Sequence, residues 1–409
     1  MRFPILALLI AAGCAAPDAP SMTQPDMKKV VIDDSTHADD MATTSSPDLA
    51  SVQLPPSKWV MGYYAGYSST SYPVSSIYWD GLTHIAVAFF TPKADGTLDT
   101  TLYQGSAATG LALAKQLVDA AHANGKKALI SIGGASSRST WVAATSSAHL
   151  AAFTASLVAL LKDPGFDGID LDWEPVEATD GPLLKALLDG LRAAAPSAIL
   201  TMPVYPLNTN AAPDLSLYVP LAADLDQMNV MTYGMAGAYT GWKSWHSSAL
   251  HQSSTSAPMS VEGSVTGYVS AGIDRSKLGV GAGAYGLCYT SPVTGPLQAL
   301  GSATVKASVT YENIVDGYAA LSGAVKAYDT VARAPYLSFA TDSAPTSTAS
   351  KCRYITYEDP QSLADKSAFV KSEGYGGVIV WTINNGYLPS APAGQRDPLL
   401  TALKTGLLD

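Results

Sequence analysis

The sequence has few charged residues and no long apolar segment. Charged residues make up 14% of its 409 residues, and 34 acidic residues against 24 basic ones leave a formal net charge of −10. Because this charge repels a polyphosphate backbone, the composition argues against nucleic acid as a partner. No stretch reaches the roughly 20 apolar residues that a membrane-spanning helix needs, so we expect no transmembrane span. A neutral polymer or a small molecule suits this composition better.

The chain begins with a segment that is typical of a bacterial export signal. Arg2 precedes an apolar run over residues 3–10, and small residues follow as far as Ala16. A basic start, a short apolar core and a small-residue exit predict a signal peptide over residues 1–16. Two processing routes compete. Cys14 resembles the lipidated cysteine of a lipoprotein and would anchor the protein at the cell envelope, whereas cleavage after Ala16 would give a secreted protein.

Residues 17–56 are rich in Asp, Ser, Thr, Pro and Ala and have little periodicity. This composition predicts a disordered tether. The chain has only three cysteines. If Cys14 is lipidated or removed, Cys288 and Cys352 remain, and an oxidising compartment permits them to pair. The alternative is two buried free thiols.

From residue 58 onward, short apolar runs alternate with helical patterns. The strand-like runs cover residues 59–64, 83–89, 127–132, 168–172, 199–203, 227–233, 277–283 and 377–381, and the helical patterns include residues 104–123, 148–161, 181–194, 261–271, 361–372 and 397–404. Strands separated by helices pair in parallel through crossover connections. Eight such units predict a closed (β/α)₈ TIM barrel over residues 57–409. A doubly wound open sheet is the weaker alternative, because no Gly-rich phosphate loop follows the first strand.

One connection is too long for a barrel loop. Residues 287–358, rich in Thr, Ser, Ala and Tyr, follow the seventh strand. A structureless loop of this length is uncommon in a compact domain, so we expect a small inserted subdomain. Because Cys288 lies at its start and Cys352 near its end, a disulfide would close its base.

Three acidic residues are spaced by two along the fourth predicted strand. In an extended strand, Asp170, Asp172 and Glu174 project from one face, and the apolar residues between them project from the other. The apolar face belongs against the helices, so the acids should point into the barrel. Glu174 then lies nearest the C-terminal end of the strand, where active sites of this fold are found.

Structural roles explain these acids poorly. Lys and Arg occur in the strand-like runs only at their starts, and burying like charges without partners is costly. A metal site is also disfavoured, because no His is near and one strand makes a poor cage. Crowded carboxyls cannot all ionise, so at least one should hold a proton at neutral pH. A general acid needs such a proton.

The segment Asp167-Gly168-x-Asp170-x-Asp172-x-Glu174 resembles the signature of glycoside hydrolase family 18, the chitinase family. Other segments are similar to motifs that this family has on its first, third, sixth, seventh and eighth strands. These segments are residues 62–64, residues 131–134 (Ser-Ile-Gly-Gly), residues 227–233, residues 277–281 with Tyr285 and Gly286, and residues 376–381. The insertion resembles the α+β insertion of one chitinase subfamily.

The resemblance implies a chitinase that hydrolyses β-1,4 linkages between N-acetylglucosamine units with retention, the substrate's acetamido oxygen acting as nucleophile. By motif, Glu174 would be the acid and then the base, Asp172 would hold the acetamido N–H, Asp170 would share a proton with Asp172 beside Ser131, and Tyr233 would donate to the acetamido oxygen. Trp381 would form the floor under the reacting sugar. Candidate wall residues are Tyr63, Phe89, Met231, Tyr285 and, from the loop after the sixth strand, Trp245. Neither a metal nor a cofactor is implied, and we expect a monomer.

One position departs from the family. An Asp usually follows the sixth-strand tyrosine, and Gly234 stands there instead. This difference leaves two alternatives beside a chitinase. One is an endo-β-N-acetylglucosaminidase that acts on N-glycans. The other is a non-catalytic protein that binds chitooligosaccharides, although relatives of that type usually lack the acid that Glu174 supplies here.

Overall fold

The computed structural model describes residues 58–409 except residues 211–214 and 252–255. The predicted signal peptide, the Cys14 anchor and the tether therefore lie outside the described residues. Within the described part of the chain, no helix is both long and apolar enough to cross a bilayer.

Eight parallel strands form a closed barrel, which confirms the predicted (β/α)₈ fold. Their order around the barrel is β1, β2, β4, β5, β6, β7, β8 and β14, and β14 pairs back to β1. The strands are β1 (Trp59–Ala65), β2 (His84–Pro92), β4 (Lys127–Gly134), β5 (Gly168–Trp173), β6 (Ile199–Val204), β7 (Gln227–Val230), β8 (Leu278–Gly283) and β14 (Gly377–Trp381). The short strand β3 (Leu98–Asp99) pairs antiparallel with β2.

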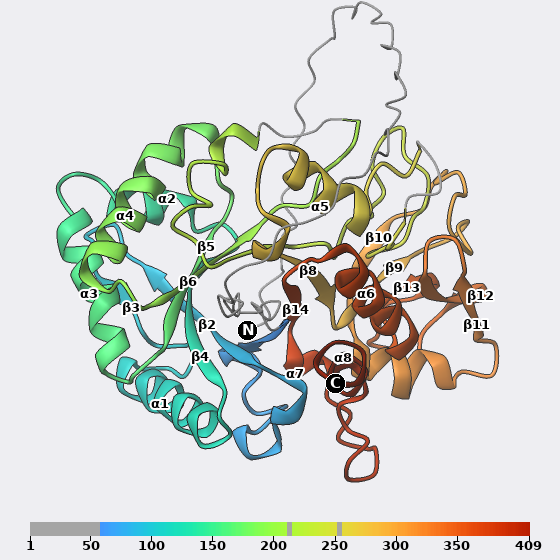
Figure 1. Cartoon of the computed structure of the whole chain (residues 1–409). Helices are drawn as coiled ribbons and strands as arrows, with labels where there is room; N and C mark the ends of the chain where they lie inside the picture. Colours follow the sequence, from blue (N-terminus) through green and yellow to red (C-terminus); the bar gives the residue numbers. More distant parts are fainter. Residues whose placement is uncertain (1–57, 211–214, 252–255) are drawn as a thin grey trace, which may run out of the picture. The chain divides into compact units, whose positions relative to one another are not determined.

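Helices pack around the outside of the barrel (Figure 1). They are α1 (Ala107–Ala123), α2 (Arg138–Ala144), α3 (Leu150–Lys162), α4 (Gly181–Ala194), α5 (Val261–Ser270), α6 (Pro360–Glu373), α7 (Ile383–Gly386) and α8 (Pro398–Leu403). The predicted helix over residues 104–123 begins three residues late. Its actual N-cap is Ser106, whose hydroxyl accepts from the Thr109 N–H, and Tyr103 has φ 61°, outside the helical region.

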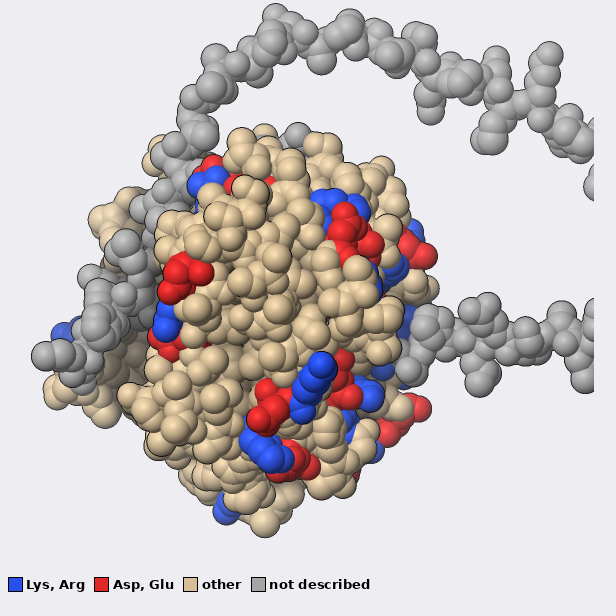
Figure 2. Space-filling view, turned by 90° about the vertical axis from the view of Figure 1, so that its left-hand side faces the viewer, with Lys and Arg blue, Asp and Glu red and all other residues tan. Residues whose placement is uncertain are grey.

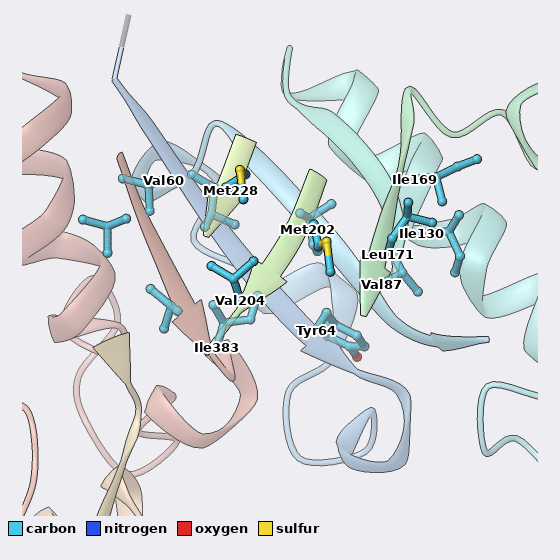
Figure 3. Close-up of a cluster of buried hydrophobic side chains, with 14 of the residues drawn as sticks. Val60, Tyr64, Val87, Ile130, Ile169, Leu171, Met202, Val204, Met228 and Ile383 are labelled. Carbon is cyan, nitrogen blue, oxygen red and sulfur yellow. The ribbon is translucent and has the colours of Figure 1, made fainter. Parts of the chain in front are cut away.

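Alternation along the strands separates an outer core from the barrel interior. On β1, Val60 and Tyr64 belong to the large cluster between barrel and helices, part of which is drawn in Figure 3. The intervening Met61 and Tyr63 belong to a second cluster that fills the interior. Because successive side chains on a strand point to opposite faces, β1 contributes to both cores.

The connection between β8 and β14 forms an antiparallel five-stranded sheet, in orange at the right of Figure 1. Its strands are β9 (Tyr285–Tyr289), β10 (Val305–Thr310), β11 (Val325–Asp329), β12 (Ala334–Ser343) and β13 (Cys352–Thr356). A disulfide joins Cys288 of β9 to Cys352 of β13, with Cα atoms 5.2 Å apart. The insertion also contains a helical segment over residues 311–320, which includes the π-helix Asn313–Gly317 and the 3-10 helix Tyr318–Ala320, so it combines a sheet with a short helix as predicted.

Charged side chains on the face shown in Figure 2 lie in small groups of both signs, separated by uncharged surface. Ion pairs one helical turn apart, such as Lys115 with Asp119 on α1 and Lys185 with Asp189 on α4, likewise place opposite charges side by side. This face therefore presents no field of one sign that would attract a charged polymer.

Candidate active site

Strand β5 holds the acidic residues on the interior face of the barrel. Its apolar residues Ile169, Leu171 and Trp173 are buried in the cluster that packs against the helices. Asp170 and Asp172 are buried too, but they belong to the opposite face. Glu174 follows the last residue of β5 and is half-buried. The strand thus delivers three carboxyls in a row toward the C-terminal end of the barrel.

Asp170, the deepest carboxyl, receives hydrogen bonds from three other barrel strands, β1, β4 and β6. Tyr63 and Ser131 donate to its Oδ2 over 2.9 and 2.7 Å, and Thr201 donates to its Oδ1 over 2.5 Å. Burial raises the pKa of Asp170, while the three donors act in the opposite direction. Since every partner is a hydroxyl donor, the site solvates the ionised form of Asp170 from three sides.

Asp172 lies between the other two acids and is 4% exposed. Burial first, then the charges of Glu174 and Asp170, raise the pKa of Asp172 well above its ordinary value. The interaction between the carboxyls of Asp172 and Glu174 favours a proton on one of the two. Asp172 Oδ1 is buried and has no hydrogen-bond partner among the described residues. The site therefore contains an unpaired acceptor beside a pair of carboxyls with raised pKa values.

The carboxyl of Glu174 lies beside a tyrosine hydroxyl. Tyr205 donates to Glu174 Oε2 over 3.2 Å. Burial raises the pKa of Glu174, and the bonds from Tyr205 and Asp172 partly offset this rise. Because Asp172 and Glu174 both have raised pKa values and interact, the pair titrates as a unit and keeps a proton to higher pH than isolated carboxyls do.

Aromatic side chains surround the carboxyls. The Trp381 ring stacks on Phe89 with centroids 5.5 Å apart and meets Tyr63 edge-on at 5.4 Å. Trp381 is half-buried, so part of its surface stays available. Tyr233 contacts Tyr285 edge-on at 6.2 Å. Burial, Tyr285 and then the charges of the three acids raise the pKa of Tyr233 well above its ordinary value, so its hydroxyl stays a donor.

Glycines on β8 make room for these tyrosines. A Cβ at Gly281 would lie 2.8 Å from the Tyr233 ring, and a Cβ at Gly283 would lie 2.8 Å from the ring of Tyr285. Gly234 has φ 64°, and a Cβ there would lie 2.9 Å from the Tyr285 hydroxyl. A side chain at position 234 would thus meet both a left-handed backbone conformation and the Tyr285 hydroxyl.

The structure brings together most of the predicted site residues, but not all of them. Met231 is half-buried just after β7, where its N–H bonds the Val204 carbonyl. Trp245 is separate from the others. Its side chain is fully buried in the cluster that joins the insertion to the barrel, and its indole N–H donates to the Met259 carbonyl. A side chain with no accessible surface cannot receive a sugar, so we omit Trp245 from the site.

The predicted strand over residues 227–233 also needs correction. Strand β7 ends at Val230, because the N–H groups of Thr232 and Tyr233 bond the carbonyls two residues before them and turn the chain. Tyr233 therefore leaves from a turn rather than from the strand. The position of the Tyr233 side chain therefore depends on the contacts that hold this turn in place.

Two site residues were missed in the sequence. Thr201 lies in β6 and Tyr205 comes directly after this strand, which pairs with β5. Residues 201, 203 and 205 alternate in the same way as the acids of β5, and this spacing could have predicted that they face inward. Within the described residues, no group of three or more His, Cys, Asp or Glu side chains could hold a metal ion.

Comparisons with known proteins place these observations in context. The family model for glycosyl hydrolases family 18 matches residues 59–386. Chitinase 1 of Aphanocladium album is 27% identical over 381 residues, covering 84% of this chain and 82% of that protein. A chitinase-like effector of Moniliophthora roreri is 27% identical over 382 residues, covering 80% of this chain and 89% of that protein.

Solved structures share the fold. The crystal structure of a Group IV chitinase of Ostrinia furnacalis in complex with allosamidin matches with a TM-score of 0.71 at 22% identity. The match covers 86% of this chain and 99% of that one. At this level of identity, the likeness extends to the architecture of the barrel.

Proposed function

Because the chain belongs to glycosyl hydrolases family 18, we propose that it is a chitinase that cleaves β-1,4 linkages in chitin and N-acetylglucosamine oligosaccharides. The reaction retains the anomeric configuration and uses the substrate's acetamido oxygen as nucleophile. The observation that carries this proposal is the buried, unpaired Asp172 Oδ1 beside Glu174, on one face of a barrel strand where both carboxyls have raised pKa values.

Glu174 is the general acid and then the general base. In the first step the proton held by the Asp172–Glu174 pair passes through Glu174 to the glycosidic oxygen, the bond from that oxygen to the anomeric carbon breaks, and the acetamido oxygen bonds to the anomeric carbon. In the second step Glu174 takes a proton from water, whose oxygen bonds to the anomeric carbon and reopens the ring. The half-buried position of Glu174 allows it to reach both the leaving group and water.

Asp172 orients and stabilises the acetamido group. Its unpaired Oδ1 can accept the acetamido N–H, and the ionised carboxylate then stabilises the positive charge of the ring intermediate. Asp170 supports this change, because its three hydroxyl donors allow it to share charge and proton with Asp172. Tyr233 donates to the acetamido oxygen, and the available face of Trp381 packs against the C–H groups of the sugar.

The test is hydrolysis of tetra- and hexa-N-acetylchitooligosaccharides by the purified chain. We expect short products whose first anomer is β, and Glu174→Gln should lower kcat by about 10²- to 10⁴-fold because a general acid contributes that much. Absence of products from the unchanged chain between pH 4 and pH 8, or equal rates for both proteins, would overturn the proposal. Cleavage of an N-glycoprotein without cleavage of the oligomers would point to the N-glycan core as substrate.

One alternative has support of its own. A relative of similar identity is named a chitinase-like effector, and Gly234 replaces an Asp that the family usually has. The departure at Gly234 favours a protein that binds chitooligosaccharides without hydrolysing them. Calorimetry distinguishes the two, because this alternative requires tight binding of the hexamer with no change in the oligomer distribution after prolonged incubation.

The proposal includes export of the protein as a monomer. The predicted export signal over residues 1–16 supports export, with either lipidation of Cys14 or cleavage after Ala16. The mass of the mature N-terminal peptide distinguishes lipidation from cleavage, and light scattering of the purified chain measures the oligomeric state.

A further inference from the structure

The segment that follows Tyr233 returns to the barrel as a buried strip. Residues 244–248 are all buried, although three of them are serines and one is His246. This strip lies between the turn that carries Tyr233 and the insertion. Buried polar residues need partners, and the partners of this strip connect the two regions.

Ser247 and Ser248 hold the backbone on both sides of Tyr233. The Ser248 hydroxyl donates to the Thr232 carbonyl over 2.5 Å. The Ser247 hydroxyl accepts from the Gly234 N–H over 3.1 Å, and the Ser247 carbonyl accepts from the Met235 N–H over 2.9 Å. Tyr233 is therefore flanked by two residues whose peptide groups are bound to one dipeptide.

The dipeptide Ser247–Ser248 is also held by contacts with β13 and α6. Thr356, the last residue of β13, accepts from the Ser247 N–H over 2.9 Å. Lys366 of α6, fully buried, donates to the Ser248 carbonyl over 2.8 Å and pairs with buried Glu358 over 2.7 Å. A buried ion pair is costly to break from one side, so it holds the Ser248 carbonyl firmly.

His246 strengthens the link to the insertion. Its Nε2 lies 3.1 Å from the Asp329 carboxylate at the end of β11, and its Nδ1 lies 3.2 Å from the Tyr354 hydroxyl of β13. Burial lowers the pKa of His246, with Asp329 opposing this effect. The strip thus has contacts with two strands of the insertion on one side and with the Tyr233 turn on the other.

We propose that Ser248, held by the Lys366–Glu358 pair, is a positioning residue that sets where Tyr233 stands relative to Asp172 and Glu174. The insertion then does more than extend the barrel rim, because it braces the turn from which Tyr233 projects. The Tyr233 ring has little freedom to compensate, since it packs against the backbone of Gly281, where a Cβ would lie 2.8 Å from it. This inference rests on the proposed function, in which Tyr233 donates to the substrate.

The test uses Ser248→Ala in the full chain with the hexa-N-acetyl oligosaccharide. Loss of the bond to the Thr232 carbonyl should lower kcat by about 10-fold, because small misplacements of a reacting group are costly. KM should change by less than about 2-fold, because the lost contact acts in the transition state. In a Tyr233→Phe background, Ser248→Ala should change kcat by less than about 2-fold, since its effect passes through the Tyr233 hydroxyl.

Two buried serines provide matched controls. Ser244→Ala removes a hydroxyl from the same strip that bonds Gly295 of the insertion, and Ser367→Ala removes one from α6 that bonds Leu363. Neither hydroxyl contacts the Tyr233 turn, so both variants should keep kcat within about 2-fold of the unchanged chain. Circular dichroism and thermal melting establish that all variants are folded at the assay temperature.

Equal kcat for Ser248→Ala and Ser244→Ala, or additive effects of Ser248→Ala and Tyr233→Phe, would overturn the inference. The Glu174→Gln measurement separates this failure from failure of the proposed function. If Glu174→Gln abolishes hydrolysis while Ser248→Ala does not affect kcat, the enzyme assignment stands and the positioning role falls. If Glu174→Gln has no effect, both fall.

Discussion

At the residue scale, the three carboxyls along β5 differ in their hydrogen-bond partners, and these partners suit each carboxyl to a different role. Asp170 accepts three hydroxyl bonds, Asp172 has one unpaired oxygen, and Glu174 is half-buried at the end of the row. The environment of Asp170 stabilises an ionised carboxylate, and the free oxygen of Asp172 can accept an N–H from a ligand. Glu174 can transfer a proton to a ligand. Position along one strand is therefore enough to give identical side-chain chemistry different functions.

Tyr205 tunes the acid at the same scale. Its bond to Glu174 stabilises the carboxylate and lowers the pKa of Glu174. In Tyr205→Phe, that pKa should rise by about one unit, because a hydrogen bond to a charged group contributes about 1.5–3 kcal/mol at most. A general acid is active while protonated, so the alkaline limb of the profile of kcat/KM against pH should move upward by about one pH unit.

Tyr328→Phe is the matched control for this prediction. It also removes a tyrosine bond to a carboxylate, here Asp365, but Tyr328 lies on β11 of the insertion. Its pH profile should coincide with that of the unchanged chain. An alkaline limb that stays in place in Tyr205→Phe, or moves to lower pH, would contradict the role assigned to Tyr205.

At the scale of elements, the insertion is held together by its sheet and by one covalent link. Strands β9 and β13 are hydrogen-bonded neighbours, and Cys288 and Cys352 join them across 64 residues of chain. Such a link reduces the entropy of the unfolded chain, and for a loop of this length the effect is about 4 kcal/mol in the chain-entropy model. Cys288→Ser with Cys352→Ser should lower the free energy of unfolding by about that amount.

Chemical denaturation measures this change, and reductant provides a second readout. Dithiothreitol should lower the midpoint of the unchanged chain but leave the midpoint of the double variant in place. Because the paired register of β9 and β13 remains, kcat at 25 °C should stay within about 2-fold. Equal denaturation midpoints for both proteins without reductant would show that the disulfide contributes no stability.

At the scale of the whole molecule, contacts between distant parts of the chain close the barrel. The Tyr72 hydroxyl, between β1 and β2, donates to Asp397 Oδ1 over 2.5 Å just before α8. The Tyr72 ring also stacks on Tyr387 at 4.4 Å. These contacts tie the first connection to the C-terminal helix, where residues 325 positions apart in the sequence meet.

The burial of Asp397, which the Tyr72 hydrogen bond only partly offsets, makes stability depend on pH. Burial raises the pKa of Asp397 to about 6 from an ordinary value of 3.8. A raised carboxyl pKa contributes stability that is fully present below pH 3.8 and is lost as pH rises through 6. Asp397→Asn should therefore gain stability relative to the unchanged chain between pH 4 and pH 7, by up to about 3 kcal/mol.

Urea denaturation at pH 4, 5, 6 and 7 checks this difference between the two proteins. Gln116→Ala at an exposed position of α1 is the control, because it removes no titratable group and its difference from the unchanged chain should vary little with pH. A difference for Asp397→Asn that is constant over this range, or that shrinks as pH rises, would refute the prediction.

The barrel and its acidic strand could be predicted from the sequence because both depend on local periodicity. Apolar runs separated by helical patterns predicted the eight strands, and the two-residue spacing of the acids predicted that they share the interior face. The motif resemblance predicted the family, which the family model confirms. The start of α1 differed from the prediction because capping by Ser106, rather than periodicity, decides where that helix begins.

What the sequence determined by itself was therefore which side chains each strand directs inward, because the alternation of a strand is a property of its covalent geometry. Only the tertiary structure decided which of them meet. Thr201 and Tyr205 reach the acids from a neighbouring strand, and Trp245, near Tyr233 in sequence, is buried in another cluster. The buried strip of residues 244–248 follows an irregular path that is set by partners more than 100 residues away in the sequence. No periodicity in the sequence encodes such a path.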